Sequence, residues 1–247
     1  MTSKFPLALI TGAADRIGKT LAATLAENGY AVLLHYRTSA LRADATAAEI
    51  RALGVPVFTF QADLTSVGKI DALFAYADSL LANPTNQLEK FSVLVNSAAV
   101  MKRANIGKMP VAEWDSTFNL NLRAAFLCAQ QAFARMDSGL IVNISDIGAQ
   151  KAWTAFPAYT VSKAALDSLT KVMARSFAPR VRVNAIAPGL ALASDVVTPE
   201  EWQRLVQRLP LQRAAHLDEL GATLEFLLKN EYITGQIIAI DGGYSLI

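Results

Sequence analysis

A tyrosine and a lysine four residues apart, Tyr159 and Lys163, have the clearest capacity for acid–base chemistry in this sequence. They stand in a run that reads as a helix, where this separation places both side chains on one face. An ammonium group beside a phenol lowers the pKa of the phenol, which brings a tyrosine closer to proton transfer near neutral pH. Taken alone, the same spacing is also typical of a solvated pair on a helix surface.

A turn with two glycines near the N-terminus is the second candidate. The apolar run Leu7–Ile10 leads into Gly12 and Gly18, and a helix is predicted over Arg16–Asn28. Glycines in such a turn let the backbone approach a pyrophosphate, which then lies on the helix N-terminus. One position where the dinucleotide-binding fingerprint has glycine is alanine here, so the fingerprint is incomplete.

The composition favours one α/β domain over residues 1–247. The chain is 53% hydrophobic and 18% charged, which suits a sizeable core, and its net charge of +2 gives no broad footprint for nucleic acid. Met1–Pro6 lacks the apolar stretch of a signal peptide, and no apolar run reaches the length of a membrane span. We therefore expect a cytoplasmic protein that binds neither nucleic acid nor membrane.

The few cysteines and histidines narrow the chemistry further. Cys128 is the only cysteine, so no intramolecular disulfide can form, and its apolar helical surroundings indicate a packing role. The two histidines, His35 and His216, argue against a zinc site, and we expect no metal.

Short apolar runs alternate with helical stretches along the whole chain. The runs lack the polar–apolar alternation of half-buried strands, as expected for parallel strands that are buried on both faces. Right-handed crossovers would join them into a single-domain, doubly wound Rossmann fold with a parallel seven-stranded sheet flanked by helices. The predicted strands are Leu7–Ile10, Ala31–His35, Val57–Gln61, Val93–Val95, Leu140–Ile144, Arg182–Ile186 and Ile237–Ile240.

Helices and loops fill the segments between these strands. Loops are expected at Asn83–Glu89, Met101–Met109 and Gly189–Pro199, and the last of them is the candidate for a substrate lid. The predicted helices are Arg16–Asn28, Ala40–Leu53, Val67–Leu81, Val111–Met136, Ala158–Phe177 and Leu217–Leu228.

Several short motifs follow one another in an order and spacing that are specific as a set. They are Thr11-Gly12 with Ile17-Gly18, Asp63-Leu64, Asn96-Ser97-Ala98-Ala99, Asn121, Tyr159 with Lys163, Arg182-Val183-Asn184, Pro188-Gly189 and Asp241-Gly242-Gly243. With them, the chain resembles the short-chain dehydrogenase/reductase family over essentially its whole length. The resemblance implies a Rossmann-type domain that binds NAD(H) or NADP(H). It also implies a dimer or tetramer, and we expect a homotetramer because the apolar tail Ile237–Ile247 would be buried against a partner.

The resemblance also implies roles for individual residues. Tyr159 would be the general acid/base, Lys163 would lower its pKa and hold the nicotinamide ribose, and Asn121 would anchor a proton-relay water. Asn96 would stabilise the sheet and line the cofactor cleft, and Asp63 would meet the adenine. The residues implied in cofactor binding are Gly12, Arg16, Ile17, Gly18, Tyr36, Arg37, Thr38, Ser39, Asp63, Leu64, Asn96, Ser97, Ala98, Tyr159, Lys163, Pro188 and Gly189.

The end of the second predicted strand indicates NADPH/NADP+ rather than NADH. A site that selects NAD has an acidic residue there to hold the ribose hydroxyls, whereas this strand continues as Tyr36-Arg37-Thr38-Ser39. Arg37 could pair with the 2′-phosphate, with the neighbouring hydroxyls donating to it. Arg16 adds positive potential from the glycine turn, and Asp15 works against it. The alternative is that Arg37 merely solvates a loop.

The departure at Asp146 bears most directly on the substrate. The family has serine thirteen residues before the tyrosine, where this chain has Asp146 next to Ser145. A slip of register could bring Ser145 into that place, although adjacent strand residues point to opposite faces. Serine donates a hydrogen bond to a carbonyl oxygen that becomes negative, whereas an ionised carboxylate would repel that oxygen. Asp146 therefore suits a protonated carboxyl or a substrate with nitrogen donors, such as a heterocyclic C=N bond.

An aspartate at this position is a mark of the pteridine reductase branch, which the segment 35–39 and the C-terminal stretches also resemble. Where that branch has an aromatic residue stacked on the pterin, this chain has Met101, whose sulfur can pack on a flat ring. The substrate residues implied are Met101, Asp146, Tyr159 and Leu190.

Three functions stay open at this point. The first is an NADPH-dependent reductase of pteridines of the dihydropteridine, dihydromonapterin or dihydrofolate type. The second is a generic NADP(H)-dependent carbonyl or alcohol oxidoreductase, and the third is a non-catalytic redox sensor. A sensor need not keep Asn121, Tyr159 and Lys163 together, which argues against the third function.

Overall fold

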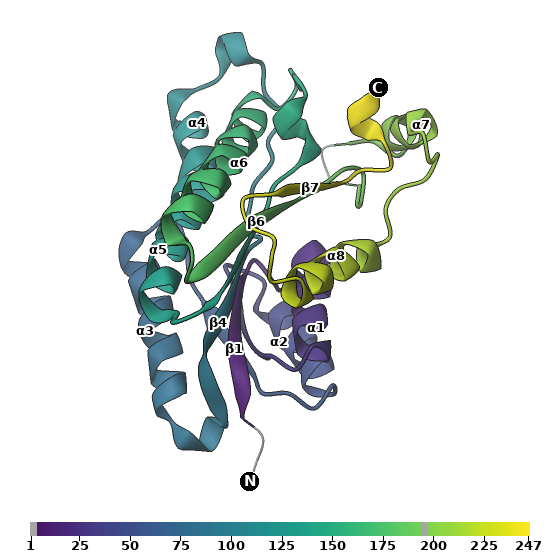
Figure 1. The fold of residues 1–247 in the computed structure, drawn as a ribbon. Coiled ribbons are helices and arrows are strands. Elements are labelled where there is room, and N and C mark those ends of the chain that lie inside the picture. The colour runs from purple at the N-terminus through teal and green to yellow at the C-terminus, as the bar shows by residue number, and fades with distance from the viewer. Residues whose placement is uncertain (1–3, 194–196) are drawn as a thin grey trace.

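A parallel sheet of seven strands, ordered β3-β2-β1-β4-β5-β6-β7, forms the centre of the molecule (Figure 1). The structure is a computed structural model that describes residues 4–193 and 197–247. This architecture confirms the predicted Rossmann-type α/β fold. The strands are β1 (Phe5–Thr11), β2 (Ala31–Tyr36), β3 (Val57–Gln61), β4 (Leu88–Asn96), β5 (Gly139–Ile144), β6 (Val181–Pro188) and β7 (Ile237–Ile240).

Both faces of the sheet are covered, which explains the uninterrupted apolar runs. Along β1, Leu7 and Leu9 pack on one side and Ala8 and Ile10 on the other, and none of the four is exposed. One face carries α1 (Arg16–Glu27), α2 (Ala40–Arg51) and α8 (Leu217–Lys229), and the other carries α3 (Val67–Ala82), α5 (Ala125–Arg135) and α6 (Pro157–Phe177) (Figure 1). Among the described residues, no helix has the length and apolar character to cross a membrane.

The predicted helix Val111–Met136 is helical but is not one regular α-helix. It consists of α4 (Val111–Phe118), the π-helical segment Asn119–Ala124 and α5. A π-helical turn widens the helix locally and is frequent at functional sites. Asn121 lies in the middle of this segment.

One predicted loop is partly wrong. The segment predicted as the loop Asn83–Glu89 forms a 3₁₀ turn at Pro84–Asn86 and then enters β4, because Leu88 is buried and pairs with Phe5 of β1. In the loop predicted over Gly189–Pro199, residues 194–196 lie outside the described residues.

Helix α7 (Pro199–Arg208) follows this loop and was not predicted. Its start does have a sequence signal, since Thr198 caps the helix by accepting from the Glu201 amide at 3.2 Å and proline occupies the first turn.

The carboxyl ends of the parallel strands meet at one edge of the sheet. There β1 lies between β2 and β4, so the chain leaves β1 toward one side and reaches β4 on the other. Ligands of open α/β sheets bind in the crevice at such a switch point. We therefore expect a ligand-binding site among the residues that follow β1, β2, β4, β5 and β6.

Candidate active site

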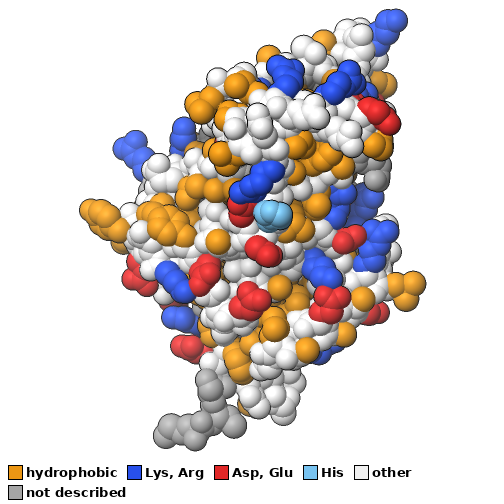
Figure 2. Space-filling model, turned by 90° about the vertical axis from the view of Figure 1, so that its right-hand side faces the viewer, with side chains coloured by type: hydrophobic (Ala, Val, Ile, Leu, Met, Phe, Trp, Pro, Cys, Tyr) orange, Lys and Arg blue, Asp and Glu red, His pale blue; other side chains and the backbone are white. Residues whose placement is uncertain are grey.

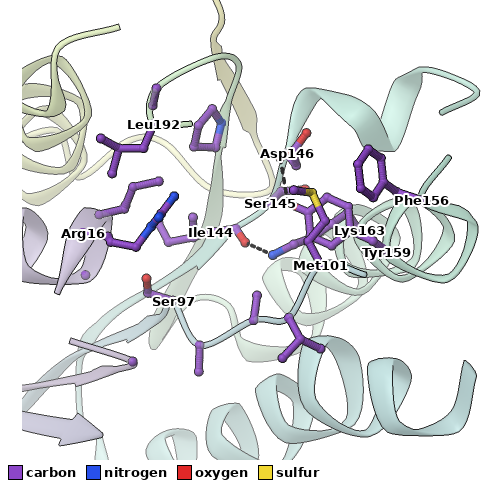
Figure 3. Close-up of a pocket in the computed structure, with 18 of the residues that line it drawn as sticks. Arg16, Ser97, Met101, Ile144, Ser145, Asp146, Phe156, Tyr159, Lys163 and Leu192 are labelled. Carbon is purple, nitrogen blue, oxygen red and sulfur yellow. Dashed lines mark hydrogen bonds between the residues drawn. The ribbon is translucent and has the colours of Figure 1, made fainter. Parts of the chain in front are cut away.

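A cavity of about 900 Å³ follows these strand ends, from the glycine turn after β1 past the end of β2 to Asp146 and Tyr159 (Figure 3). Most residues chosen from the sequence line it. Those residues are Gly12, Arg16, Ile17, Gly18, Tyr36, Arg37, Thr38, Ser39, Leu64, Ser97, Ala98, Met101, Asp146, Tyr159, Lys163, Pro188, Gly189 and Leu190.

The glycine turn needs its glycines for steric reasons. Gly12 has φ +68°, and a Cβ there would lie 2.9 Å from Cα of Ala98. A Cβ at Gly18 would lie 2.2 Å from the carbonyl oxygen of Gly12. The turn is therefore packed against the start of α1 and against the segment after β4, with its backbone on the cavity wall.

Charges around the turn are partly compensated. Asp15 caps α1 by accepting from the Arg16 amide at 2.7 Å, and its other carboxylate oxygen lies 2.9 Å from Nη1 of Arg42 on α2. Because Arg42 offsets the charge of Asp15, the helix N-terminus keeps its capacity to attract an anion. Arg16 lines the cavity, and its guanidinium donates to the carbonyl of Ala193 at 3.1 Å.

Asp146 and Tyr159 form a hydrogen-bonded pair at the other end of the cavity (Figure 3). Tyr159, in the first turn of α6, is 8% exposed and donates its hydroxyl to Oδ2 of Asp146 at 2.7 Å. The other carboxyl oxygen, Oδ1, accepts from the Gly148 amide at 2.7 Å. The carboxyl is thus fixed by its own loop and aimed at the phenol.

Ser145 points away from this pair. Its hydroxyl donates to Oδ1 of Asp167, on α6, at 2.5 Å. The chain is still extended here, so neighbouring side chains diverge as they do in a strand. A slip of register between Ser145 and Asp146 is therefore excluded in this structure.

The electrostatics of the pair keep Tyr159 protonated. Burial raises its pKa well above its ordinary value of 10.0, and the charge and hydrogen bond of Asp146 raise it further. Burial also raises the pKa of Asp146, against the hydrogen bonds from Tyr159 and Gly148 and the charge of Lys163, which lower it.

Lys163 does not act on the phenol as the four-residue spacing predicted. Its ammonium group donates to the carbonyl of Ile144 at 2.6 Å and lies 5.7 Å from the centre of the Tyr159 ring. Burial lowers the pKa of Lys163 to about 8, although Asp146 and Asp167 oppose that change. The predicted lowering of the Tyr159 pKa is wrong for this structure because the nearest charge to the hydroxyl is a carboxyl.

Asn121 acts on the backbone behind the cavity. Its Oδ1 accepts from the amide of Val100 at 2.9 Å, and its Nδ2 donates to the carbonyl of Val100 at 2.9 Å and to Oγ of Ser162 at 3.1 Å. The side chain thereby ties the segment after β4 to α6. It does not line the cavity.

Two other predicted residues also do not line the cavity. Asn96 donates to Oδ1 of Asn143 at 2.9 Å, which joins β4 to β5 inside the sheet as expected, but it does not line the cleft. Asp63 accepts from the amide of Thr65 at 2.9 Å, and its two neighbours, Ala62 and Leu64, line the cavity in its place. Each side chain is held by a hydrogen bond outside the cavity, that of Asn96 to a neighbouring strand and that of Asp63 within its own turn.

Aromatic residues that the sequence reasoning missed enclose the Asp146 end of the cavity. Trp153, Phe156, Trp202 and Tyr244 line it together with Met101. The ring centres of Trp153 and Phe156 are 6.5 Å apart, and those of Trp153 and Tyr244 are 6.1 Å apart. Two of them, Trp153 and Phe156, lie between Asp146 and Tyr159 in the sequence, and this position could have identified them as site residues. Such a wall offers flat apolar faces to a planar ring.

Comparisons with known proteins agree on one family. The family profile described as enoyl-(acyl carrier protein) reductase matches residues 12–245. The 3-oxoacyl-[acyl-carrier-protein] reductase FabG of Staphylococcus aureus is 34% identical over 244 residues, which cover 96% of each chain. The solved structure of FolM alternative dihydrofolate reductase 1 from Brucella canis, complexed with NADP, is 37% identical with a TM-score of 0.90, over 98% of this chain and 94% of that one.

Proposed function

Because the chain belongs to the short-chain dehydrogenase/reductase family, we propose that it is an NADPH-dependent reductase of pteridines, of the dihydropteridine, dihydromonapterin or dihydrofolate type. The observation that carries the substrate class is the carboxyl of Asp146, 2.7 Å from the hydroxyl of Tyr159, where the family has serine. The likeness to a FolM alternative dihydrofolate reductase supports the same class.

The residues at the other end of the cavity fit a dinucleotide. The backbone of the glycine turn is packed too closely for any side chain at Gly12 or Gly18, and it faces the cavity at the N-terminus of α1. No carboxylate follows β2 where a site for NADH would have one, and Arg37 lines the cavity there. NADPH would supply hydride to the substrate carbon, and Lys163, which lines the cavity, would hold the nicotinamide ribose.

The acid–base pair suits reduction of a C=N bond. Hydride addition at carbon requires a proton at nitrogen, and Tyr159 holds its proton at neutral pH because burial and Asp146 raise its pKa. Asp146 can accept from ring or amino N–H groups, and its own raised pKa favours a carboxyl that can deliver a proton. In its ionised form the carboxylate would instead repel the oxygen of a ketone as that oxygen becomes negative.

The second candidate is a generic NADP(H)-dependent carbonyl reductase, which the FabG relatives favour. A panel with purified protein and NADPH separates the two candidates, with dihydrobiopterin, dihydromonapterin, dihydrofolate, a simple ketone and a 3-oxoacyl thioester as substrates. We expect turnover of at least one dihydropteridine. Turnover of ketones or thioesters alone would reject the pteridine proposal in favour of the second candidate.

We predict that Arg37→Ala lowers the preference for NADPH over NADH by roughly tenfold to a hundredfold. The reason is the loss of a charge-assisted contact to the 2′-phosphate, which is worth about 1.5–3 kcal/mol. The ratio of kcat/KM for the two cofactors measures this preference.

Arg175→Ala is the matched control for this experiment. Arg175 is an exposed arginine in the last turn of α6 and does not line the cavity, so its removal should leave the cofactor preference unchanged. An Arg37→Ala enzyme with the wild-type preference would show that Arg37 only solvates its loop.

We also propose that the protein is a homotetramer. β7 is the last strand of the sheet, and side chains near that edge are exposed and apolar, including Phe226 and Leu246. Figure 2 shows hydrophobic side chains between charged ones on the face that carries α8. Light scattering at micromolar concentration should give four copies of the 26.5 kDa chain, and a monomer would contradict the proposal.

A further inference from the structure

His35 joins the ends of three strands beneath the glycine turn. It lies near the end of β2 and is 2% exposed. Its Nδ1 accepts from the Gly12 amide at 3.1 Å, and its Nε2 lies 3.0 Å from the carbonyl oxygen of Ala62, just after β3. A ring nitrogen that accepts an amide hydrogen must keep its lone pair. Only the neutral tautomer with hydrogen on Nε2 satisfies both bonds, and it donates to Ala62.

Backbone hydrogen bonds around His35 join the same three segments. The carbonyl of His35 accepts from the Ala13 amide at 3.0 Å, and the Ala62 amide donates to the carbonyl of Tyr36 at 3.0 Å. One residue thus holds two successive amides of the turn, one through its ring and one through its backbone. Gly12 is also in contact with Ala98, so a shift of its amide would move the cavity wall.

We propose that His35 is a positioning residue for cofactor binding: the neutral imidazole holds the Gly12 amide and thereby fixes the shape of the glycine turn, and a second proton on the ring releases it. The proposal rests on the proposed use of this turn for NADPH. His35 itself does not take part in the hydride or proton transfer.

The charges near the ring decide how easily that second proton binds. Burial lowers the pKa of His35 from 6.5 to about 4, whereas the carbonyl of Ala62 and the charge of Asp63 raise it. Arg37 acts on Asp63 from the loop after β2, and on the glycine turn the charged groups are Asp15, paired with Arg42, and Arg16. Protonated Nδ1 would be a donor facing the Gly12 amide, which is also a donor.

The sign of the pH dependence follows from these values. The folded pKa lies below the unfolded one, so the unfolded chain binds more protons between about pH 4 and pH 6.5. The contribution of neutral His35 to stability is complete above pH 6.5 and is lost as the pH falls toward 4. NADPH binds the folded protein, so its affinity should fall only as the pH approaches the folded pKa of about 4, where the turn loses the partner of its Gly12 amide.

The test compares NADPH binding, followed by cofactor fluorescence, and the melting temperature from pH 4 to pH 8 in the wild type, His35→Gln and His35→Phe. Glutamine can accept from Gly12 and donate to Ala62 but does not titrate, and phenylalanine fills the space with neither bond. We expect His35→Phe to weaken NADPH binding at pH 7.5 by more than about tenfold. We expect His35→Gln to bind within a few-fold of the wild type and to lose less affinity and stability in acid.

His216→Gln is the control, since His216 is the other histidine and lies exposed at the start of α8, away from the cavity. Titration of the NADPH phosphate affects binding equally in the wild type and in every variant. The difference in acid dependence between the wild type and His35→Gln therefore reports the imidazole alone. The proposal is wrong if His35→Gln keeps the acid dependence of the wild type, or if a folded His35→Phe binds NADPH normally. If His35→Phe does not fold, the comparison with His35→Gln decides alone.

These outcomes are separate from those of the proposed function. Failure to turn over any pteridine would leave the binding comparison intact. If the wild type binds no NADPH, the proposed function and the cofactor role of His35 fail together, whatever the melting curves show about the effect of His35 on stability.

Discussion

Tyr159→Phe should lower the turnover of every accepted substrate by roughly 10²- to 10⁴-fold while NADPH still binds. The phenol is buried and hydrogen-bonded to Asp146, and its raised pKa keeps it protonated across the neutral range. Phenylalanine keeps the ring and removes only the hydroxyl with its hydrogen bond to Asp146. The measurement is single-turnover reduction with NADPH in excess, together with NADPH binding by fluorescence.

Lys163→Ala is the informative comparison for this experiment. The lysine is buried, donates to the carbonyl of Ile144, and is the residue that we propose holds the nicotinamide ribose. Its removal should weaken both turnover and cofactor binding, whereas Tyr159→Phe should affect turnover alone. Near-normal turnover by Tyr159→Phe on every accepted substrate would show that another group donates the proton.

Asp146→Ser should reduce pteridine turnover by more than about tenfold, since one polar contact at the transition state is worth roughly 1–3 kcal/mol. The same change should raise activity on ketones, because serine can donate to an oxygen that becomes negative. The ratio of kcat/KM for a dihydropteridine and a ketone measures the switch. Unchanged pteridine activity in this variant would refute the role given to Asp146.

A shift in pH dependence should accompany this change. Asp146 raises the pKa of Tyr159 through its charge and its hydrogen bond, so the pKa of the phenol should fall when the carboxyl is removed. A proton donor with a lower pKa loses its proton at lower pH, so the alkaline limit of activity should move downward. Ser145→Ala is the matched control, because Ser145 is the neighbouring residue but bonds to Asp167, and its removal should change neither the ratio nor the alkaline limit.

The fold could be predicted because the order of its elements follows from local patterns, whereas most residues of the cavity wall were implied by the family resemblance. Buried parallel strands produce short apolar runs, and crossover helices must lie between them, so the order of elements determines which strand ends meet. Gly12, Arg37, Tyr159 and Lys163 could be assigned to one cavity because each follows a predicted strand or belongs to a helix at a specific spacing. The aspartate at position 146 was also visible from its distance to Tyr159.

Other features depend on how side chains distant in the chain are buried together. The sequence predicted a lowered pKa for Tyr159 from the nearby lysine, but the folded chain puts a carboxyl closer to the hydroxyl and excludes water, so the pKa is raised. The bonds of Asn121 to Val100 and of His35 to Gly12 likewise join separate segments. Periodicity and spacing determine which element a residue occupies, whereas its charge state and partners depend on distances and burial that only the tertiary structure decides.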